Sequence, residues 1–202
     1  MLYVLLFAML LIASLGDLII PIIIGTKYPG YNHLIDTIST LGTSESPVQK
    51  IESINLTVVG ILFIIFAFGQ WFTFEQKSWL HNWYTIGILI YAIGCILAGI
   101  FPEDTAGVAE TGFGKIHGIA SGLGFLFLII NPLWAVWMKE FRDLQLINAI
   151  FFVLAILTFT LFLISENKNV GFLKYTGLFQ RLNLIVLYGT LIMNYLGLNK
   201  GS

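Results

Sequence analysis

The sequence predicts an all-α integral membrane protein, with six transmembrane helices in one bundle and a short amphipathic helix in the first loop. Two observations lead to this fold class. Of the 202 residues, 57% are hydrophobic and only 10% are charged, whereas soluble domains carry about 25% charged residues. The hydrophobic residues also gather into six long runs that are almost free of charge, each near the roughly 20 residues needed to cross a bilayer.

These six runs take up most of the chain and leave no room for a soluble domain. We therefore expect a single transmembrane domain over residues 1–200, and we interpret Gly201-Ser202 as a cloning remnant. The first run lacks a basic segment before it and a small-residue cleavage site after it, so it is interpreted as a retained helix. The runs cover residues 2–24, 56–74, 83–101, 116–138, 146–164 and 182–198.

Net charge and cysteine content narrow the classes of partner and cofactor. The formal net charge is −1 at pH 7, which gives no indication of a nucleic-acid partner. Cys95, the only cysteine, falls inside a predicted span. A disulfide and a cysteine metal site are therefore not expected.

The tryptophans and basic residues predict how the helices are oriented. Six helices place both termini on one side, together with the connections near 75–82 and 139–145. The tryptophans fall on this side in the manner of an aromatic belt, and Lys139 and Arg142 lie close to helix ends there, although the longer loops opposite hold more basic residues in total. We expect a protein of the cell (plasma) membrane with cytoplasmic termini. The belt comprises Trp71, Trp79, Trp83, Trp134 and Trp137.

The first loop, residues 25–55, is predicted to contain local structure. Leu34, Ile38 and Leu41 recur at helical spacing within residues 31–42. This spacing predicts the short amphipathic helix, lying at the membrane interface or against the mouth of the bundle.

A capping box is predicted at the start of the second helix. Ser46 would be the N-cap, Pro47 the first helical residue and Gln49 the third, which is the pattern of a capping box with proline at the first position. The first turns of this helix would then extend beyond the hydrocarbon and present Lys50, Glu52 and Ser53.

Proline and glycine residues predict an end, a kink and a close contact in the third and fourth helices. Pro102 is expected to end the third helix, and Asn131-Pro132 to kink the fourth. Gly114, Gly118 and Gly122 recur every four residues, and such a stripe predicts close approach of a neighbouring helix backbone.

Four short motifs carry a resemblance to a known family. The sequence resembles the prokaryotic six-helix membrane family catalogued as domain of unknown function number 998, over nearly the whole chain. It is also distantly similar to the FRAG/DRAM/Sfk membrane family, some of whose members are tied to GPI-lipid remodelling. The first resemblance implies a six-helix membrane fold and brings no activity with it. The motifs are Asp36–Gly42 (DTISTLG), Phe101–Asp104 (FPED), His117–Ser121 (HGIAS) and Gly177–Arg181 (GLFQR).

These motifs bring polar residues to the membrane face opposite the termini. Ionisable groups at the bilayer boundary are costly and usually face a cavity or a partner. One interpretation is acid–base or nucleophilic chemistry, with His117 as general base, Asp104 orienting it and Ser39 as nucleophile. The candidate substrate-binding residues are Arg181, which would hold an anionic headgroup, with Asp36, Glu103, Gln180 and Ser121.

Two other interpretations of the same residues stay open. A divalent metal such as zinc or manganese is a weak alternative, held by His117, Asp104 and Asp36, with His33 as a further ligand. No histidine–glutamate motif of the zinc hydrolases supports it, so no cofactor is expected. In the structural interpretation, Arg181 pairs with Asp104 or Glu103 and fastens loops over the helix ends.

Two ionisable residues lie apart from this group. Asp17 falls inside the first predicted span, four residues before Pro21. It could relay protons or bind a cation, cap a kink, or pair with Arg181. His81 lies between Trp79 and Trp83 and is predicted to be an interfacial side chain.

The leading functional hypothesis is a polar His/Asp/Arg site at one membrane face that binds a phospholipid, an isoprenoid or another amphiphile. Hydrolysis or transfer of the headgroup is the reaction that these residue types would support, so an enzyme would be a lipid-directed hydrolase or transferase. The alternative is a non-catalytic sensor or assembly subunit, whose polar face is structural or docks a membrane-protein partner. The sequence does not decide between them.

Overall fold

The computed structural model describes residues 1–75, 77–105, 107–166 and 174–198, and in them every regular element is helical. The fold class predicted from the sequence is confirmed. Gly201-Ser202 lies outside the described residues. The long helices are α1 (Leu2–Gly25), α2 (Gln49–Thr73), α3 (Trp79–Ile100), α4 (Gly112–Trp137), α5 (Gln145–Glu166) and α6 (Thr176–Leu198), and the 3₁₀ helices are η1 (Ser39–Gly42) and η2 (Lys139–Leu144).

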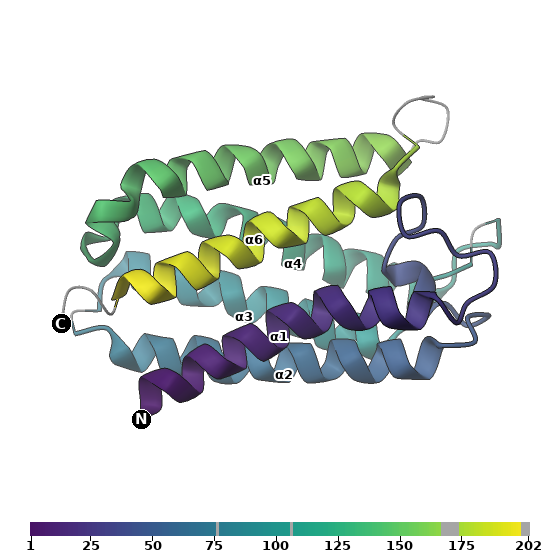
Figure 1. Ribbon diagram of the computed structural model, residues 1–202, viewed down its shortest axis with the longest axis horizontal. Coiled ribbons are helices and arrows are strands. Elements are labelled where there is room, and N and C mark those ends of the chain that lie inside the picture. Colours follow the sequence, from purple (N-terminus) through teal and green to yellow (C-terminus); the bar gives the residue numbers. More distant parts are fainter. Residues whose placement is uncertain (76, 106, 167–173, 199–202) are drawn as a thin grey trace.

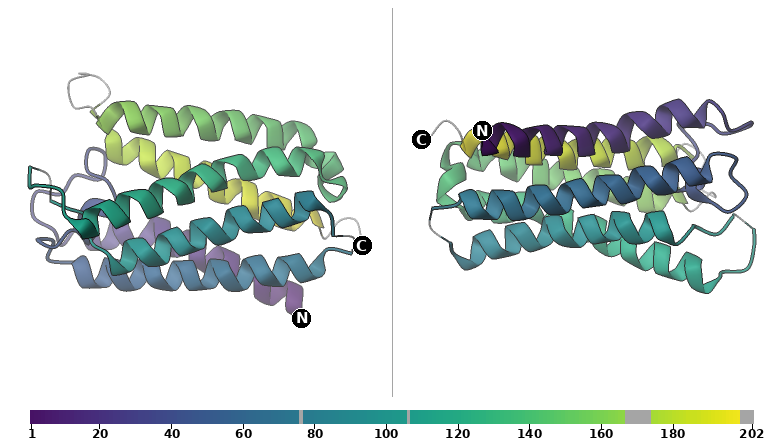
Figure 2. Two further views of the ribbon diagram at one scale, coloured as in Figure 1. Left: turned by 180° about the vertical axis from the view of Figure 1, so that it is seen from behind. Right: turned by 90° about the horizontal axis from the view of Figure 1, so that it is seen from below.

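The six long helices run alternately up and down and close into a ring. Each packs against the next along the chain, and α6 returns to pack against α1. In Figure 1, α1 and α6 lie in front, and the view from behind in Figure 2 brings α3 and α4 to the front. The start of α1, the end of α6 and η2 share one end of the bundle, while the long first loop and η1 lie at the other (Figure 1). We call these the terminal end and the loop end.

All six long helices have the length and composition to cross a membrane. Their outer faces carry large apolar side chains exposed in the isolated chain, such as Ile12 on α1 and Val153 on α5. On α5 only Asn148, Ala155 and Ser165 are buried among the described residues. A surface of this kind is stable against lipid rather than water, so the chain is a multi-pass membrane protein.

Aromatic and polar side chains close the terminal end. Trp134 contacts both Trp79 and Trp83, in the belt that the sequence predicts. His81, predicted to be an interfacial side chain, is buried at this end of the bundle. Its Nδ1 accepts a hydrogen bond from the Ser78 backbone N–H (3.0 Å), and its Nε2 lies 3.0 Å from Glu140 Oε1 on η2.

The first loop differs from its prediction. The short amphipathic helix is not confirmed: residues 31–38 form turns, and only the four residues of η1 are helical. Asp36 competes for the backbone, since its Oδ2 accepts a hydrogen bond from the Asn32 N–H (2.7 Å). The Asp36 N–H also donates to the Asn32 carbonyl (2.7 Å), so the two residues close a single turn that does not continue as a helix. Leu34 is exposed, whereas Ile38 and Leu41 are buried.

The predicted capping box is also wrong. The N-cap of α2 is Val48, without a side-chain cap, and the helix begins at Gln49. Ser46 Oγ instead accepts a hydrogen bond from the Val48 N–H (3.3 Å), which forms a turn before the helix. Glu52 is not presented outside the bundle: it is fully buried, and Asn55 Nδ2 lies 3.5 Å from its Oε2.

Proline positions in the third and fourth helices follow the sequence expectation in part. The helix α3 ends at Ile100, immediately before Phe101-Pro102, as predicted. The helix α4 continues through Pro132 to Trp137. The Asn131 side chain beside Pro132 donates a hydrogen bond to the Tyr84 carbonyl of α3 (3.0 Å), so the polar residue at this point joins two helices.

Candidate functional site

Arg181 on α6 holds the first loop against the loop end of the bundle. Its Nη1 donates hydrogen bonds to the carbonyl oxygens of His33 (2.7 Å), Asp36 (3.2 Å) and Gly177 (2.9 Å). Its Nη2 donates to the hydroxyl of Tyr31 (2.6 Å). The side chain is buried. Its hydrogen bonds to these carbonyls hold the backbone of the first loop against α6, and we call this set of contacts the Arg181 fastening. The pairing with Asp104 or Glu103 considered from the sequence is not among the ion pairs of the described residues.

The backbone of α6 continues this fastening. The N–H groups of Gly177 and Leu178 donate to the carbonyls of Ile35 (3.2 Å) and Leu34 (3.0 Å). A side chain at position 177 would collide with the Asp36 and His33 carbonyls, so glycine is required for this close approach. The Gly177–Arg181 motif therefore serves to dock the first loop.

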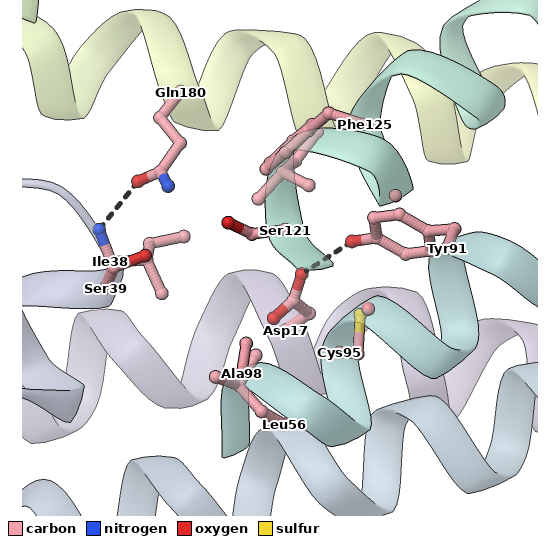
Figure 3. A pocket seen from close by; sticks show the side chains of 13 residues that line it. Asp17, Ile38, Ser39, Leu56, Tyr91, Cys95, Ala98, Ser121, Phe125 and Gln180 are labelled. Atoms are coloured by element: carbon pink, nitrogen blue, oxygen red, sulfur yellow. Dashed lines mark hydrogen bonds between the residues drawn. The ribbon is translucent and has the colours of Figure 1, made fainter. Parts of the chain in front are cut away.

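Gln180 places Ser39 beside the interior. The Gln180 Oε1 accepts a hydrogen bond from the Ile38 N–H (2.6 Å), the residue before η1. Figure 3 shows this bond with Ser39 adjacent to it. The predicted binding residue Gln180 and the predicted nucleophile Ser39 are thus brought together, although they are 141 positions apart in a sequence of 202 residues.

Asp104 stabilises the connection between α3 and α4. Its Oδ2 accepts a hydrogen bond from the Thr111 N–H (2.7 Å) and its Oδ1 from the Thr111 hydroxyl (2.7 Å). The backbone hydrogen bond and then the hydroxyl bond hold the pKa of Asp104 below its ordinary value. Both carboxylate oxygens are therefore occupied within the loop.

The pKa of Glu103, the neighbouring acid, is shifted in the opposite direction. It is half-buried, and burial raises its pKa to about 7, with the negative charges of Glu166 and Asp104 adding to the effect. Near neutral pH this carboxyl group exchanges a proton, so it can donate as well as accept a hydrogen bond.

His117 on α4 is buried against the end of α3. Its Nδ1 lies 2.9 Å from the Phe101 carbonyl, which can only accept, so Nδ1 carries the proton. In the neutral ring Nε2 is then the acceptor nitrogen, and it is buried without a hydrogen-bond partner. Among the described residues no hydrogen bond joins His117 to Asp104 or to Ser39. Ser121 Oγ donates to the His117 carbonyl (2.8 Å), which is bonding within the helix.

Three hollows surround these residues. The first, the mouth cavity, is lined by Asp36, Glu103 and Asp104 together with Tyr28, Ile35, Thr37, Thr40, Thr43, Thr105, Glu166 and Thr176. The second, the lateral groove, is lined by Ser39, Glu103, His117, Ser121 and Gln180 together with Thr37, Gly118, Gly122, Phe125, Phe159, Phe162, Leu163 and Glu166. Seven of the eight residues predicted from the sequence thus line one of these two, and Arg181 lines neither.

The third hollow, the inner cavity, lies deeper between the helices. It shares Ser39, Ser121, Phe125 and Gln180 with the lateral groove. Its other lining residues are Asp17, Ile38, Leu56, Tyr91, Gly94, Cys95, Ala98, Gly124 and Leu184. Figure 3 shows Asp17 at its centre, between Ser121 and Phe125 on one side and Leu56 and Ala98 on the other.

Two glycines of the α4 stripe, Gly118 and Gly122, leave the lateral groove open, which corrects the prediction of close helix packing there, whereas Gly114 lies against the Asp104 side chain. A Cβ added at Gly118 or Gly122 would meet no atom within 4 Å. Close packing occurs instead at glycines of α3, where a Cβ at Gly94 would lie 2.7 Å from the Ala120 carbonyl oxygen. The difference depends on what faces each glycine, which spacing alone does not reveal.

The residues considered as metal ligands do not come together. Across the described ranges, no three His, Cys, Asp or Glu side chains come together in a way that could hold a metal ion. His117, Asp104 and Asp36 therefore do not form a ligand set. His33 is drawn into the Arg181 contact through its carbonyl, and burial together with the Arg181 charge lowers the pKa of its ring.

Comparison with protein families gives one match. Residues 11–196 match the family described as Protein of unknown function (DUF998). The chain belongs to this family. No curated protein and no solved structure matches the chain. The matched span includes every residue that lines the three hollows, from Asp17 to Leu184.

The site predicted from the sequence does not include two buried carboxylates of this DUF998 protein, Asp17 and Glu52. Asp17 accepts hydrogen bonds from the hydroxyls of Tyr188 and Tyr91, and Glu52 lies buried near it. An acid inside an apolar span was the available signal for Asp17. Glu52 gave no such signal, because it lies in the polar stretch before the second apolar run.

Proposed function

We propose that this protein binds an amphiphile in the lateral groove, with the polar end of the ligand at His117, Ser39 and Gln180. The observation that supports the proposal is the composition of the groove. His117, whose buried Nε2 has no hydrogen-bond partner, lines the same hollow as Phe159, Phe162 and Leu163 of α5. Polar groups at one part of a hollow and apolar ones at the other match a molecule with a headgroup and a hydrocarbon chain.

The position of the groove supports a ligand taken from the bilayer. It lies between α4 and α5, and α5 has many large apolar side chains on its exposed face. A lipid-like molecule could enter sideways without leaving the hydrocarbon. Its headgroup would meet His117 and Glu103 near the ends of α4 and α3, at the depth of the bilayer boundary.

Binding accounts for this geometry without a chemical step. The predicted orienting acid, Asp104, is bonded to Thr111, and no hydrogen bond joins His117 to Ser39. Catalysis by a nucleophile requires these groups within reach of one another. We therefore propose binding as the function, and hydrolysis or transfer of a headgroup is a reaction to be sought only if binding is found.

Filling the groove tests the proposal. The purified protein would be incorporated into nanodiscs of phosphatidylethanolamine and phosphatidylglycerol in equal amounts, extracted in detergent, and its retained lipid counted by native mass spectrometry. We expect Gly118→Leu and Gly122→Leu to lose retained lipid, because the new side chains occupy open space in the groove. Gly112→Leu is the matched control, since it also meets no atom within 4 Å but lies outside the groove.

The outcome is decisive in both directions. Retention by the unchanged protein and by Gly112→Leu, with loss in the groove variants, supports the proposal. Equal retention in all four proteins, or none in the unchanged protein, contradicts it.

A second candidate function is a non-catalytic sensor or assembly subunit. It is favoured by the internal bonding of Arg181 and Asp104, whose charged groups are both engaged by the protein itself. In this case the polar face would support the loops and a membrane-protein partner would bind to it. A stoichiometric protein partner recovered with the Gly118→Leu variant as well as with the unchanged chain would favour this candidate.

We also propose a cell-membrane location with cytoplasmic termini. Lys139 and Arg142 lie on η2 directly beside the ends of α4 and α5, where basic residues influence orientation most. A reporter fused to the N-terminus that fluoresces only in the cytoplasm should be bright, and a dark reporter on a folded protein would reverse the assignment.

A further inference from the structure

We propose that the inner cavity receives the ammonium group of the bound amphiphile, with Asp17 as its counter-ion. The inference rests on the proposed function and names the headgroup class of that ligand. The position of Asp17 supports it, because this side chain is only 3% exposed and yet lines the inner cavity.

The hydrogen bonds of Asp17 leave one oxygen free. Tyr188 and Tyr91 both donate to Oδ2, and their hydroxyls also contact each other. No hydrogen bond within the described part of the chain engages Oδ1. The two tyrosines thus orient the carboxylate and leave Oδ1 available to a ligand. Figure 3 shows the carboxylate among the cavity residues with Tyr91 bonded to one oxygen.

The surrounding charges favour a cationic occupant. Glu52 is a second acid in this region, fully buried and close enough to interact electrostatically with Asp17. Arg181 interacts electrostatically with both acids, but its guanidinium donates its hydrogen bonds to the first loop. A cation beside Asp17 would stabilise the ionised form of its carboxylate. A buried charge is stabilised by a partner of opposite sign.

The lining favours an organic ammonium over a metal ion. Aromatic rings of Tyr91 and Phe125 and aliphatic groups of Leu56, Ala98 and Leu184 make up much of the wall. Ammonium groups bind well beside one carboxylate and aromatic faces. Hard metal cations need about six oxygen ligands, and the acids, histidines and cysteine of the described residues form no cluster of three that could hold one.

The connection to the lateral groove explains why the ammonium would belong to an amphiphile. Ser39, Ser121, Phe125 and Gln180 line both hollows. A headgroup could therefore reach Asp17 while its hydrocarbon chain remains beside Phe159 and Phe162. The same ligand would be recognised by charge in the inner cavity and by apolar contact in the groove.

The test compares two lipids with the same acyl chains, phosphatidylethanolamine and phosphatidylglycerol, which differ in the ammonium group. Retention is measured by native mass spectrometry in the unchanged protein and in Asp17→Asn, a variant of nearly the same shape without the charge. We expect the unchanged protein to prefer phosphatidylethanolamine by about tenfold, which corresponds to about 1.4 kcal/mol. Asp17→Asn should retain both lipids equally.

A second variant covers failure of Asp17→Asn to fold. Leu56→Lys places an ammonium group of the protein itself in the cavity beside Asp17, and we expect it to abolish the preference while the groove stays open. Folding of each variant is checked by gel filtration and thermal unfolding. The unchanged protein is informative alone, since equal retention of the two lipids overturns the inference.

The remaining outcomes separate this inference from the proposed function. Loss of both lipids in Gly118→Leu with no preference in the unchanged protein leaves groove binding intact and rejects the ammonium site. A preference that survives in Asp17→Asn also rejects it. Thermal stabilisation of Gly118→Leu by free ethanolamine, equal to that of the unchanged protein, would indicate a small soluble amine and reject the amphiphile as its source.

Discussion

A buried amide pair at the terminal end differs from two polar side chains toward the loop end in how its hydrogen bonds are satisfied. At the terminal end, Asn148 of α5 and Asn194 of α6 are both fully buried and bond to each other twice, with each Nδ2 donating to the other Oδ1 (2.9 and 3.0 Å). Toward the loop end, Asp17 Oδ1 and His117 Nε2 have no hydrogen-bond partner among the described residues, and both side chains line hollows.

This difference separates polar groups that build the fold from those available to a ligand. A reciprocal amide pair satisfies its own donors and acceptors, so it adds stability and leaves nothing to recognise. A buried polar atom beside a cavity is unfavourable until something binds it. Residue type does not distinguish the two cases, since the loop end also contains Arg181, whose hydrogen bonds are made within the protein.

The largest effect is expected from removing the fastening at the loop end. Arg181→Met would leave the His33, Asp36 and Gly177 carbonyls without their donor. Hydrogen bonds to a charged group contribute about 1.5–3 kcal/mol each, so we expect a loss of about 3 kcal/mol or more of unfolding free energy. Thermal unfolding of the purified protein measures this loss, and limited proteolysis reports whether the first loop has come free.

Lys115→Met is the matched control for Arg181→Met. Lys115 is exposed and pairs at 3.7 Å with exposed Glu110, and surface pairs contribute about 0–1 kcal/mol. If Arg181→Met were no more destabilising than this control, the guanidinium would not be the structural fastening, and its role as a headgroup-binding residue would return.

An intermediate effect is expected at the terminal end. Asn148→Leu and Asn194→Leu each leave the carbonyl oxygen of the other buried amide without its donor, at a cost of about 1–3 kcal/mol. The double variant removes both amides together and should lose less than the sum of the two single losses. Strictly additive losses in thermal unfolding would mean that the two amides do not depend on each other, and would weaken the distinction between the two ends.

The smallest effect concerns pH at the loop end. Because the pKa of Glu103 is raised from 4.5 to about 7, the folded protein holds a proton that the unfolded chain releases. Its contribution to stability is complete below pH 4.5 and is lost as pH rises through 7. We expect the Tm to fall between pH 5 and 8, by an amount on the order of a few degrees, and Glu103→Gln to show a smaller fall.

The comparison with Glu103→Gln isolates this residue from other titrating groups. His33, His81 and His117 are present in both proteins, so their contributions cancel in the difference. Asp104 acts in the opposite direction, since its pKa is lowered and its contribution is lost only as pH falls below the usual range of an aspartate. Parallel pH curves for the two proteins would show that Glu103 does not carry the raised pKa.

Much of the fold follows from the sequence because lipid imposes a simple rule. A span must be long, apolar and hydrogen-bonded within itself, so composition alone locates α1 to α6, and Pro102 marks the end of α3. The tryptophan belt and the grouping of Ser39, Glu103, His117 and Gln180 at one face follow from helix count and direction. All of these features depend only on the position of a residue along the chain, which also sets its depth in the membrane.

Only the tertiary structure decided what faces each of these residues. Gly118 and Gly122 open a groove because no neighbouring backbone approaches them, while Gly94 is closely packed. Arg181 bonds to loop carbonyls and not to an acid, and Asp17 meets Tyr91 and Tyr188 from helices distant in the sequence. The rotation of each helix about its axis determines such contacts. That rotation depends on the packing of all six helices together, which no local pattern encodes.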